Sequence, residues 1–287
     1  MPSLIDLRRR ITSVKSTQQI TRAMKMVAAA KLRRAQDSVE AARPYATELR
    51  KVVGNLAARV GESGHPLLKQ KEENKVLLVA VTGDKGLCGA FNTNVIRRTR
   101  EEIATRSEAA DVELLLLGRR GADFFRRRPT PIRAEYLTLF AGVTYEDSAE
   151  IATDITRAFT DGAYDAVYVV YNQFVSVMNQ KLTCERLLPL DTDFAADVDT
   201  TQEYIFEPSA SEILEAIVPG YVGTQVHKVL LDSQAAEHAA RMTAMDAATK
   251  NAGELIDSLT LTYNRSRQAA ITKELIEVVS GAQALEG

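Results

Sequence analysis

A helical repeat runs through both ends of this sequence and constrains the fold more than any other feature. Apolar and small residues recur at spacings of three and four from Leu4 to Leu56, which places them along one side of a helix and suits a coiled coil. About fifty helical residues at roughly 1.5 Å each make a helix of about 75 Å, deeper than an ordinary globular core. A similar pattern runs from Leu231 to Val278. The sequence therefore predicts two long amphipathic helices.

The details of these two segments predict how they pair. Both flank the same middle segment, so the direction of the chain makes them antiparallel, and the longer last helix projects beyond the first. The seam of the first helix is polar at Gln18, Thr21 and Lys25, which predicts a partner other than a plain apolar helix face. Pro44 predicts a bend in the first helix, and Pro219 predicts a break near the start of the last.

The middle of the chain changes to a strand-and-helix alternation. Short apolar runs, typical of strands buried on both faces, lie at 76–81 and 112–117, and further strands are expected at 132–136 and 165–171. Helical segments separate them, which predicts right-handed crossovers and a mostly parallel sheet. Residues 173–190 are expected to add an extended pair at one edge of the sheet.

The expected fold class is α/β: a long antiparallel coiled coil of the N- and C-terminal helices plus a central Rossmann-like domain. The expected division is a helix at 1–60, a central α/β domain at 75–195 that we call the foot, and a helix at 209–287. Residues 61–74 contain Gly, Pro and many charges, and they are expected to be a linker.

Charge is distributed unevenly along the chain. Residues 1–60 hold 13 Lys and Arg against 4 Asp and Glu, whereas residues 208–287 hold 6 against 10. The difference is consistent with attraction between the two helices, and equally with solvated faces of opposite sign. Nucleic-acid binding is less favoured, because the basic residues surround the first helix instead of following one stripe.

A glycine-rich turn follows the first predicted strand. Gly83, Gly86 and Gly89 have a spacing that matches neither the dinucleotide-binding nor the P-loop pattern. A tight structural turn that lets the helix approach the strand is therefore favoured over a nucleotide site. Asp84 and Lys85 within the turn are expected to form an exposed ion pair of little consequence.

Other reactive side chains form no recognisable constellation. Cys88 and Cys184 are far apart, which indicates a reducing compartment without a disulfide framework, and Cys88 is expected to be a small buried residue. The three histidines have no ligand spacing. No catalytic residue, cofactor or metal is therefore expected. No apolar stretch is long enough to span a membrane.

Three strings of this sequence resemble the family of gamma subunits of F-type ATP synthase. They are ITSVKSTQQITRAMKMVAAAKLRRAQ, VAVTGDKGLCGAFNTN and RMTAMDAATKNAGELIDSLTLTYNRSRQAAITKELIEVVSGAQAL, of which the last is the most specific. The resemblance covers nearly the whole chain in the same order. It implies a central rotor shaft that couples proton flow across a membrane to ATP synthesis or hydrolysis, with no catalytic residues of its own.

The resemblance also implies partners. These are the alpha and beta subunits of the catalytic head, three copies each, together with the epsilon subunit and the membrane c-ring. Neither nucleic acid binding nor direct membrane insertion is implied. The implied place is the cytoplasmic face of the bacterial inner membrane, as a peripheral part of the ATP synthase complex.

Two groups of residues match contact positions of that family. Those implied to contact the catalytic head are Met24, Lys25, Arg241, Arg267, Gln268 and Thr272. Those implied to contact the membrane ring are Tyr204 and Glu207. From the residues alone, the polar group around Arg267 is better explained as an exposed helix surface, so its role depends on the resemblance.

Two other functions account for parts of the pattern. A coiled-coil adaptor or homodimer with a partner-binding α/β domain explains the helical repeat and the absence of a catalytic motif. A nucleotide-dependent oxidoreductase explains only the glycine turn, because no acidic ribose partner or catalytic histidine is suitably placed.

Overall fold

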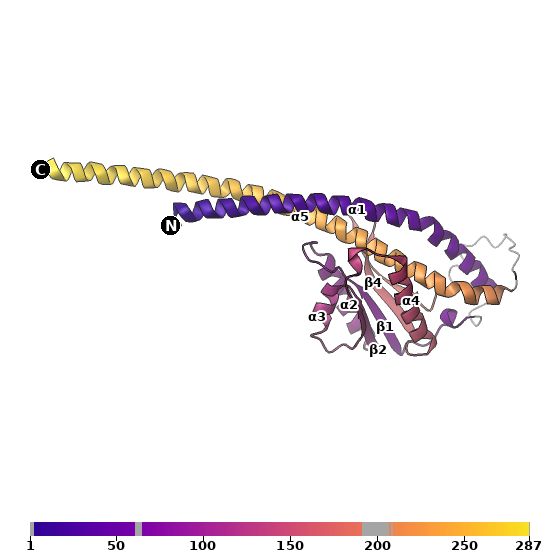
Figure 1. The fold of residues 1–287 in the computed structure, drawn as a ribbon. Helices are drawn as coiled ribbons and strands as arrows, with labels where there is room; N and C mark the ends of the chain where they lie inside the picture. Colours follow the sequence, from indigo (N-terminus) through magenta and orange to yellow (C-terminus); the bar gives the residue numbers. More distant parts are fainter. Residues whose placement is uncertain (1–2, 61–64, 191–206, 208, 287) are drawn as a thin grey trace. The chain divides into compact units, whose positions relative to one another are not determined.

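The computed structural model describes residues 3–60, 65–190, 207 and 209–286. The chain divides into two compact units, one of residues 28–241 and one of residues 1–27 with 242–287. Two long helices, α1 (Leu4–Val60) and α5 (Ala210–Glu286), contribute to both units (Figure 1). The two long helices that the periodicity predicts are therefore present.

The unit of residues 28–241 is built around a five-stranded sheet with the order β3-β2-β1-β4-β5. Its strands are β1 (Lys75–Val81), β2 (Asp111–Leu117), β3 (Ile132–Tyr136), β4 (Ala166–Phe174) and β5 (Gln180–Leu188). The first four strands are parallel to one another, and β5 at the edge is antiparallel to β4. The mostly parallel sheet is confirmed, and the predicted edge pair consists of the end of β4 and β5.

Helices cover both faces of the sheet. On one face, α2 (Phe91–Arg106) and α3 (Arg119–Phe125) pack against Leu78, Leu114 and Leu116. The other face is covered by α4 (Tyr145–Thr160), a 3-10 turn η2 (Pro66–Leu68) and parts of α1 and α5. A second 3-10 turn, η3 (Leu139–Ala141), follows β3. The continuous apolar strands of the sequence follow from this burial on both faces.

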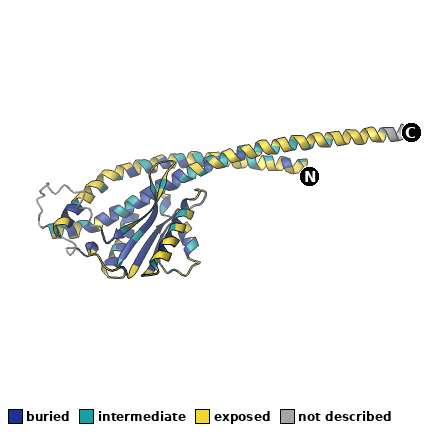
Figure 2. Cartoon of the chain, turned by 180° about the vertical axis from the view of Figure 1, so that it is seen from behind, coloured by how far each residue is buried: buried dark blue, intermediate teal, exposed yellow. Residues whose placement is uncertain are grey.

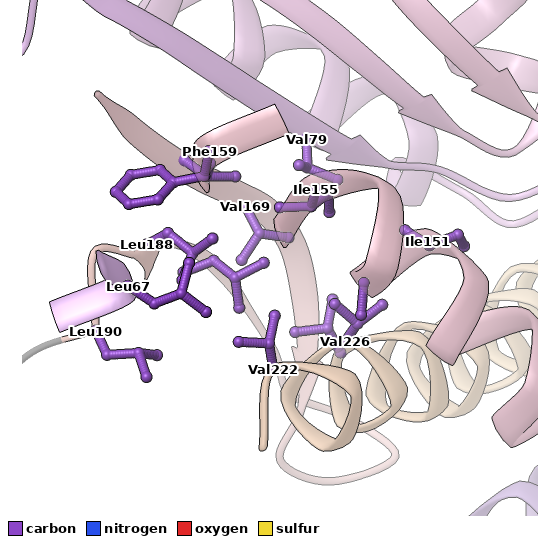
Figure 3. Close-up of a cluster of buried hydrophobic side chains, with 14 of the residues drawn as sticks. Leu67, Val79, Ile151, Ile155, Phe159, Val169, Leu188, Leu190, Val222 and Val226 are labelled. Carbon is purple, nitrogen blue, oxygen red and sulfur yellow. The ribbon is translucent and has the colours of Figure 1, made fainter. Parts of the chain in front are cut away.

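The larger core joins the long helices to the sheet. Figure 3 shows Val222 and Val226 of α5 in the same cluster as Ile151 of α4 and Val169 of β4. Val53 and Leu56 near the end of α1 are also fully buried in this cluster. Burial of each such side chain contributes roughly 1.5–3 kcal/mol, so the core fastens both helices to the foot.

The expected linker at 61–74 is partly core. Leu67 and Leu68 in η2 are fully buried, and the His65 ring nitrogen accepts a hydrogen bond from the Leu67 amide at 3.1 Å. The charged composition of this segment predicts a linker, but composition does not show that two individual leucines within it are buried.

The break predicted at Pro219 is wrong. Helix α5 continues through this proline. Leu214, Val218 and Val222 on either side of it are fully buried, so packing holds the helix together despite the lost backbone hydrogen bond. Pro44 likewise lies inside α1, which Figure 1 draws as curved along the half that contains it.

In the unit of residues 1–27 with 242–287, the two helices pair antiparallel. Lys25 Nζ lies 2.6 Å from Asp246 Oδ1, Thr21 Oγ1 lies 2.8 Å from Thr249 Oγ1, and Gln18 Nε2 donates to the Thr249 carbonyl at 3.4 Å. Residue numbers along α5 thus increase as those along α1 decrease, which is the antiparallel arrangement. The prediction that the polar seam meets something other than an apolar face is confirmed.

The predicted seam of α1 is buried on the described chain. Its buried members are Leu7, Thr21, Ala28, Leu32, Ala35, Val39, Val53 and Leu56. The other predicted seam positions are half-buried, namely Leu4, Ile11, Val14, Gln18, Lys25, Ala42, Ala46 and Leu49. Beyond the first residues of α1, α5 continues alone, and every side chain from 271 to 281 is exposed (Figure 2). The last helix therefore projects past the first within this unit, as expected.

Candidate functional site

The glycine turn lies where the strand order of the sheet reverses. Strand β1 has β2 on one side and β4 on the other, and in open α/β sheets the crevice beyond such strand ends usually binds a ligand. Here a segment of α5 occupies it. Cys88 and Phe91 pack around Ala236 of α5, with Phe174 at the end of β4 against the same cluster. We call this contact between the turn and α5 the joint.

Gly83 allows α5 to approach the turn closely. A Cβ atom at this position would lie 2.8 Å from both Cδ and Oε1 of Glu237, which is closer than real Cβ atoms approach other heavy atoms. The amide of Gly83 donates to Asn92 Oδ1 at 2.8 Å, which fixes the turn on the first helical turn of α2. The structural interpretation of Gly83 is therefore supported. A glycine is needed here because α5, which is distant in sequence, packs against the turn in addition to α2.

A buried ion pair completes the joint. Glu237 is only 3% exposed, and its Oε1 accepts a hydrogen bond from Arg241 Nη2 at 2.5 Å. The same Arg241 nitrogen donates to the Gly86 carbonyl at 3.2 Å. Burial raises the pKa of Glu237, and the Arg241 charge opposes that shift. Sequence reasoning missed Glu237, because a lone glutamate in a long helix carries no distinguishing local signal.

The exposed ion pair expected for Asp84 and Lys85 is wrong. The Asp84 carboxylate accepts backbone hydrogen bonds from Arg119, Thr138 and Phe140, each at 3.1 Å. These amides belong to the start of α3 and to the segment after β3. Asp84 therefore ties three segments together at the carboxyl end of the sheet.

The surroundings of Cys88 and His227 indicate structural roles for these side chains. Cys88 is buried, as expected, and burial raises the pKa of its thiol, which disfavours the reactive thiolate. His227 Nδ1 lies 2.9 Å from the hydroxyl of fully buried Ser148. Within the described residues, no three His, Cys, Asp or Glu side chains gather in a way that could bind a metal ion.

A cavity of about 660 Å³ lies between α1, α5 and the β4–β5 hairpin. Its polar lining includes Arg43 of α1, with Lys228 and Asp232 of α5. Asp232 is 4% exposed, and burial raises the pKa of its carboxyl to about 6 although both cations lower it. The lining is therefore of mixed charge, with two cations beside a buried carboxyl.

The residues predicted to contact the catalytic head differ in their exposure. Arg267, Gln268 and Thr272 are exposed on α5, where the chain leaves them available to another molecule. Met24 and Lys25 are half-buried, and Lys25 is paired with Asp246. Arg241 is bound within the joint, where its side chain is 13% exposed.

The structure describes one of the two residues that are predicted to contact the membrane ring. Glu207 is exposed. Tyr204 lies outside the described residues. No described helix has an apolar stretch long enough to cross a membrane.

The fold and the site define the class of this protein: an α/β domain whose crevice at the carboxyl end of the sheet is filled by a helix of the same chain, in a chain whose two long helices pair antiparallel. A family model described as ATP synthase matches residues 3–285. Proteins named ATP synthase gamma chain from Solibacter usitatus and Pelotomaculum thermopropionicum are 54% and 50% identical, with the whole of each chain covered. The chain belongs to the ATP synthase gamma chain family.

Chains of solved ATP synthase structures are also similar to this chain. A chain of the mitochondrial ATP synthase central stalk and c-ring from Tetrahymena thermophila is 28% identical, with a TM-score of 0.62 over 80% of this chain and 99% of that one. A chain of the Euglena gracilis mitochondrial ATP synthase has a TM-score of 0.70 at 20% identity, over 98% and 94% of the two chains, and shows the shared fold. The family places this chain within a rotary ATP synthase.

Proposed function

We propose that this chain is the central rotor shaft of an F-type ATP synthase, which couples proton flow across a membrane to ATP synthesis or hydrolysis by rotating. The observation that carries the proposal is the antiparallel pairing of α1 and α5 in a chain whose family match spans residues 3–285. The chain has no catalytic role of its own in this proposal, and the catalysis belongs to the surrounding subunits.

The part of α5 that extends beyond α1 supports a surrounding partner. Ile271, Leu275 and Val278 are 48%, 60% and 70% exposed and fall on one side of the helix. A contiguous apolar stripe in water indicates a surface that another molecule covers. The proposed cover is the catalytic head, formed by three alpha and three beta subunits.

We propose that Arg267, Gln268 and Thr272 contact an acidic loop of a catalytic subunit. Their exposure supports this, because a free guanidinium can form two parallel hydrogen bonds with a carboxylate. Met24 is proposed to face the same kind of loop. The Lys25 charge contributes less than an unpaired lysine would, because Asp246 already neutralises it.

The foot is proposed to bind the membrane c-ring and the epsilon subunit. Tyr204 and Glu207 are the proposed ring contacts, and the exposure of Glu207 is compatible with that role. The segments 1–60 and 209–287 would then form the shaft, and 75–195 the foot. The proposed place is the cytoplasmic face of a bacterial inner membrane, as a peripheral part of the complex.

Co-purification tests the rotor role. We expect a complex that contains one copy of this chain and three copies each of two nucleotide-binding subunits, measured by native mass spectrometry. The exposed stripe on α5 would also suit a coiled-coil adaptor, which predicts a defined homodimer of the chain. A homodimer without the head subunits would overturn the rotor proposal.

A double substitution tests the proposed contact. Arg267→Ala with Gln268→Leu should lower coupled ATP synthesis about tenfold, since loss of a charged hydrogen bond costs about 1.5–3 kcal/mol. The foot should remain folded by circular dichroism. Arg265→Ala, an exposed arginine outside the matched positions, serves as the control. Wild-type synthesis and proton coupling in the double variant would contradict the contact.

A further inference from the structure

Arg241 is bound inside this chain rather than presented at its surface. Its Nη2 donates to Glu237 Oε1 and to the Gly86 carbonyl, at 2.5 and 3.2 Å. Its Nη1 lies 3.5 Å from His238 Nδ1. These contacts use most of the directional donors of the guanidinium, and 13% of the side chain is exposed. A partner loop would therefore have to compete with an internal carboxylate.

Glu237 is out of reach of any partner. It is 3% exposed, and its carboxylate fills the space in front of Gly83 that a Cβ atom would otherwise occupy. Lys31 of α1 and Asp84 of the turn also act on it electrostatically, from two other elements of the same unit. The side chain thus contributes only through the elements it holds together.

We propose that Glu237 and Arg241 fasten α5 to the turn at Gly83 and Gly86 and so carry torque between the shaft helix and the sheet, and that Arg241 acts through this joint instead of through a direct contact with the catalytic head. Glu237 is then a positioning residue for rotational coupling. This inference rests on the proposed rotor function and assigns a different role to one of its matched residues.

The chemistry of the joint suits a contact that resists rotation. The apolar contacts of Ala236 resist separation but can slide, because apolar packing has no directional preference. A charge-assisted hydrogen bond is directional, and removing one partner of a buried pair leaves an uncompensated charge. Glu237 and Arg241 therefore resist rotation of α5 over the turn, where the apolar cluster alone does not.

The test compares Glu237→Gln, Arg241→Ala and the double variant in the assembled ATP synthase. We expect each single variant to raise hydrogen exchange of the amides of residues 83–89 about tenfold, equivalent to about 1.4 kcal/mol. We also expect each to lower the number of protons pumped per ATP hydrolysed, to a similar extent. The double variant should be no worse than either single variant, because both remove the same contact.

Two further variants sharpen the test. Gly83→Ala should reproduce the Glu237→Gln phenotype, since its Cβ displaces the carboxylate, and it carries the test if Glu237→Gln does not assemble. Arg241→Lys should restore part of the coupling, because a lysine reaches one acceptor but not two at fixed angles. Glu254→Gln, an exposed glutamate on α5, is the matched control and should change neither measurement.

The outcomes separate this inference from the rotor function. If Arg241→Ala lowers coupling while Glu237→Gln and Gly83→Ala behave like wild type, Arg241 acts at the surface and the joint is rejected. If none of the variants changes exchange or coupling, the joint is also rejected. The rotor function fails only if the wild-type chain does not assemble with a catalytic head.

Discussion

Asp84 is an example of a single side chain that holds several segments together. Its two carboxylate oxygens accept three backbone N–H groups, from α3 and from the segment after β3. Asp84→Asn keeps the size of the side chain but replaces one acceptor by a donor. We expect the free energy of unfolding to fall by about 1–3 kcal/mol, measured by urea denaturation of the full chain. Lys85→Gln, at the exposed neighbour, should leave it unchanged.

A second residue-scale prediction concerns Asp232. Its folded-state pKa of about 6 lies above the ordinary value of 3.8, so the folded chain holds this proton more tightly than the unfolded chain. Stability therefore falls as pH rises from about 4 to 6. Asp232→Asn should stabilise the chain above pH 6 by up to about 3 kcal/mol, and not below pH 4. Denaturation of both chains across this range checks it, and a pH-independent difference would contradict burial as the cause.

At the scale of elements, the polar contacts of Gln18, Thr21 and Lys25 with α5 are expected to set the register of the helix pair. Lys25 and Asp246 lie 2.6 Å apart but are 42% and 35% exposed, so solvent screens their attraction. Lys25→Glu places two carboxylates together and should increase hydrogen exchange in α1 residues 15–27 modestly, by about two- to fivefold at low salt. Adding Asp246→Lys should restore protection. Failure of the exchanged pair to restore it would show that charge does not set this register.

Periodicity was sufficient to predict the elements but not the joint. Leu7, Ala28 and Val39 are buried where the three-four spacing places them, since a helix repeats that geometry locally. Glu237 and Asp84 gain their roles from partners far away in sequence, which no local pattern encodes. Pro219 misled the prediction because a local helix rule was applied where packing on both sides of the proline prevails. The head contacts at Arg267 and Gln268 depend on a partner and stay a prediction.

At the scale of the whole molecule, the unpaired end of α5 should depend on assembly. An isolated helix of fewer than about 12–15 residues is marginal in water, and side chains 271–281 have no intramolecular cover. We expect trypsin to cut after Lys273 in the free chain and not in the assembled complex, as read by mass spectrometry. The bond after Arg241, within a packed helix, is the internal control and should resist in both. Equal cleavage at Lys273 in the complex would argue against an enclosing head.

The joint between Gly83 and Glu237 has a consequence for how this chain responds to its surroundings. In a binding protein of the same architecture, the group in the crevice comes from solution, so its occupancy changes with supply. Here the occupant is covalently part of the same polypeptide, and its effective concentration stays high at all times. The stiffness of this connection is therefore independent of metabolite levels, a useful property in a component that must work the same way in a starved cell and in a well-fed one.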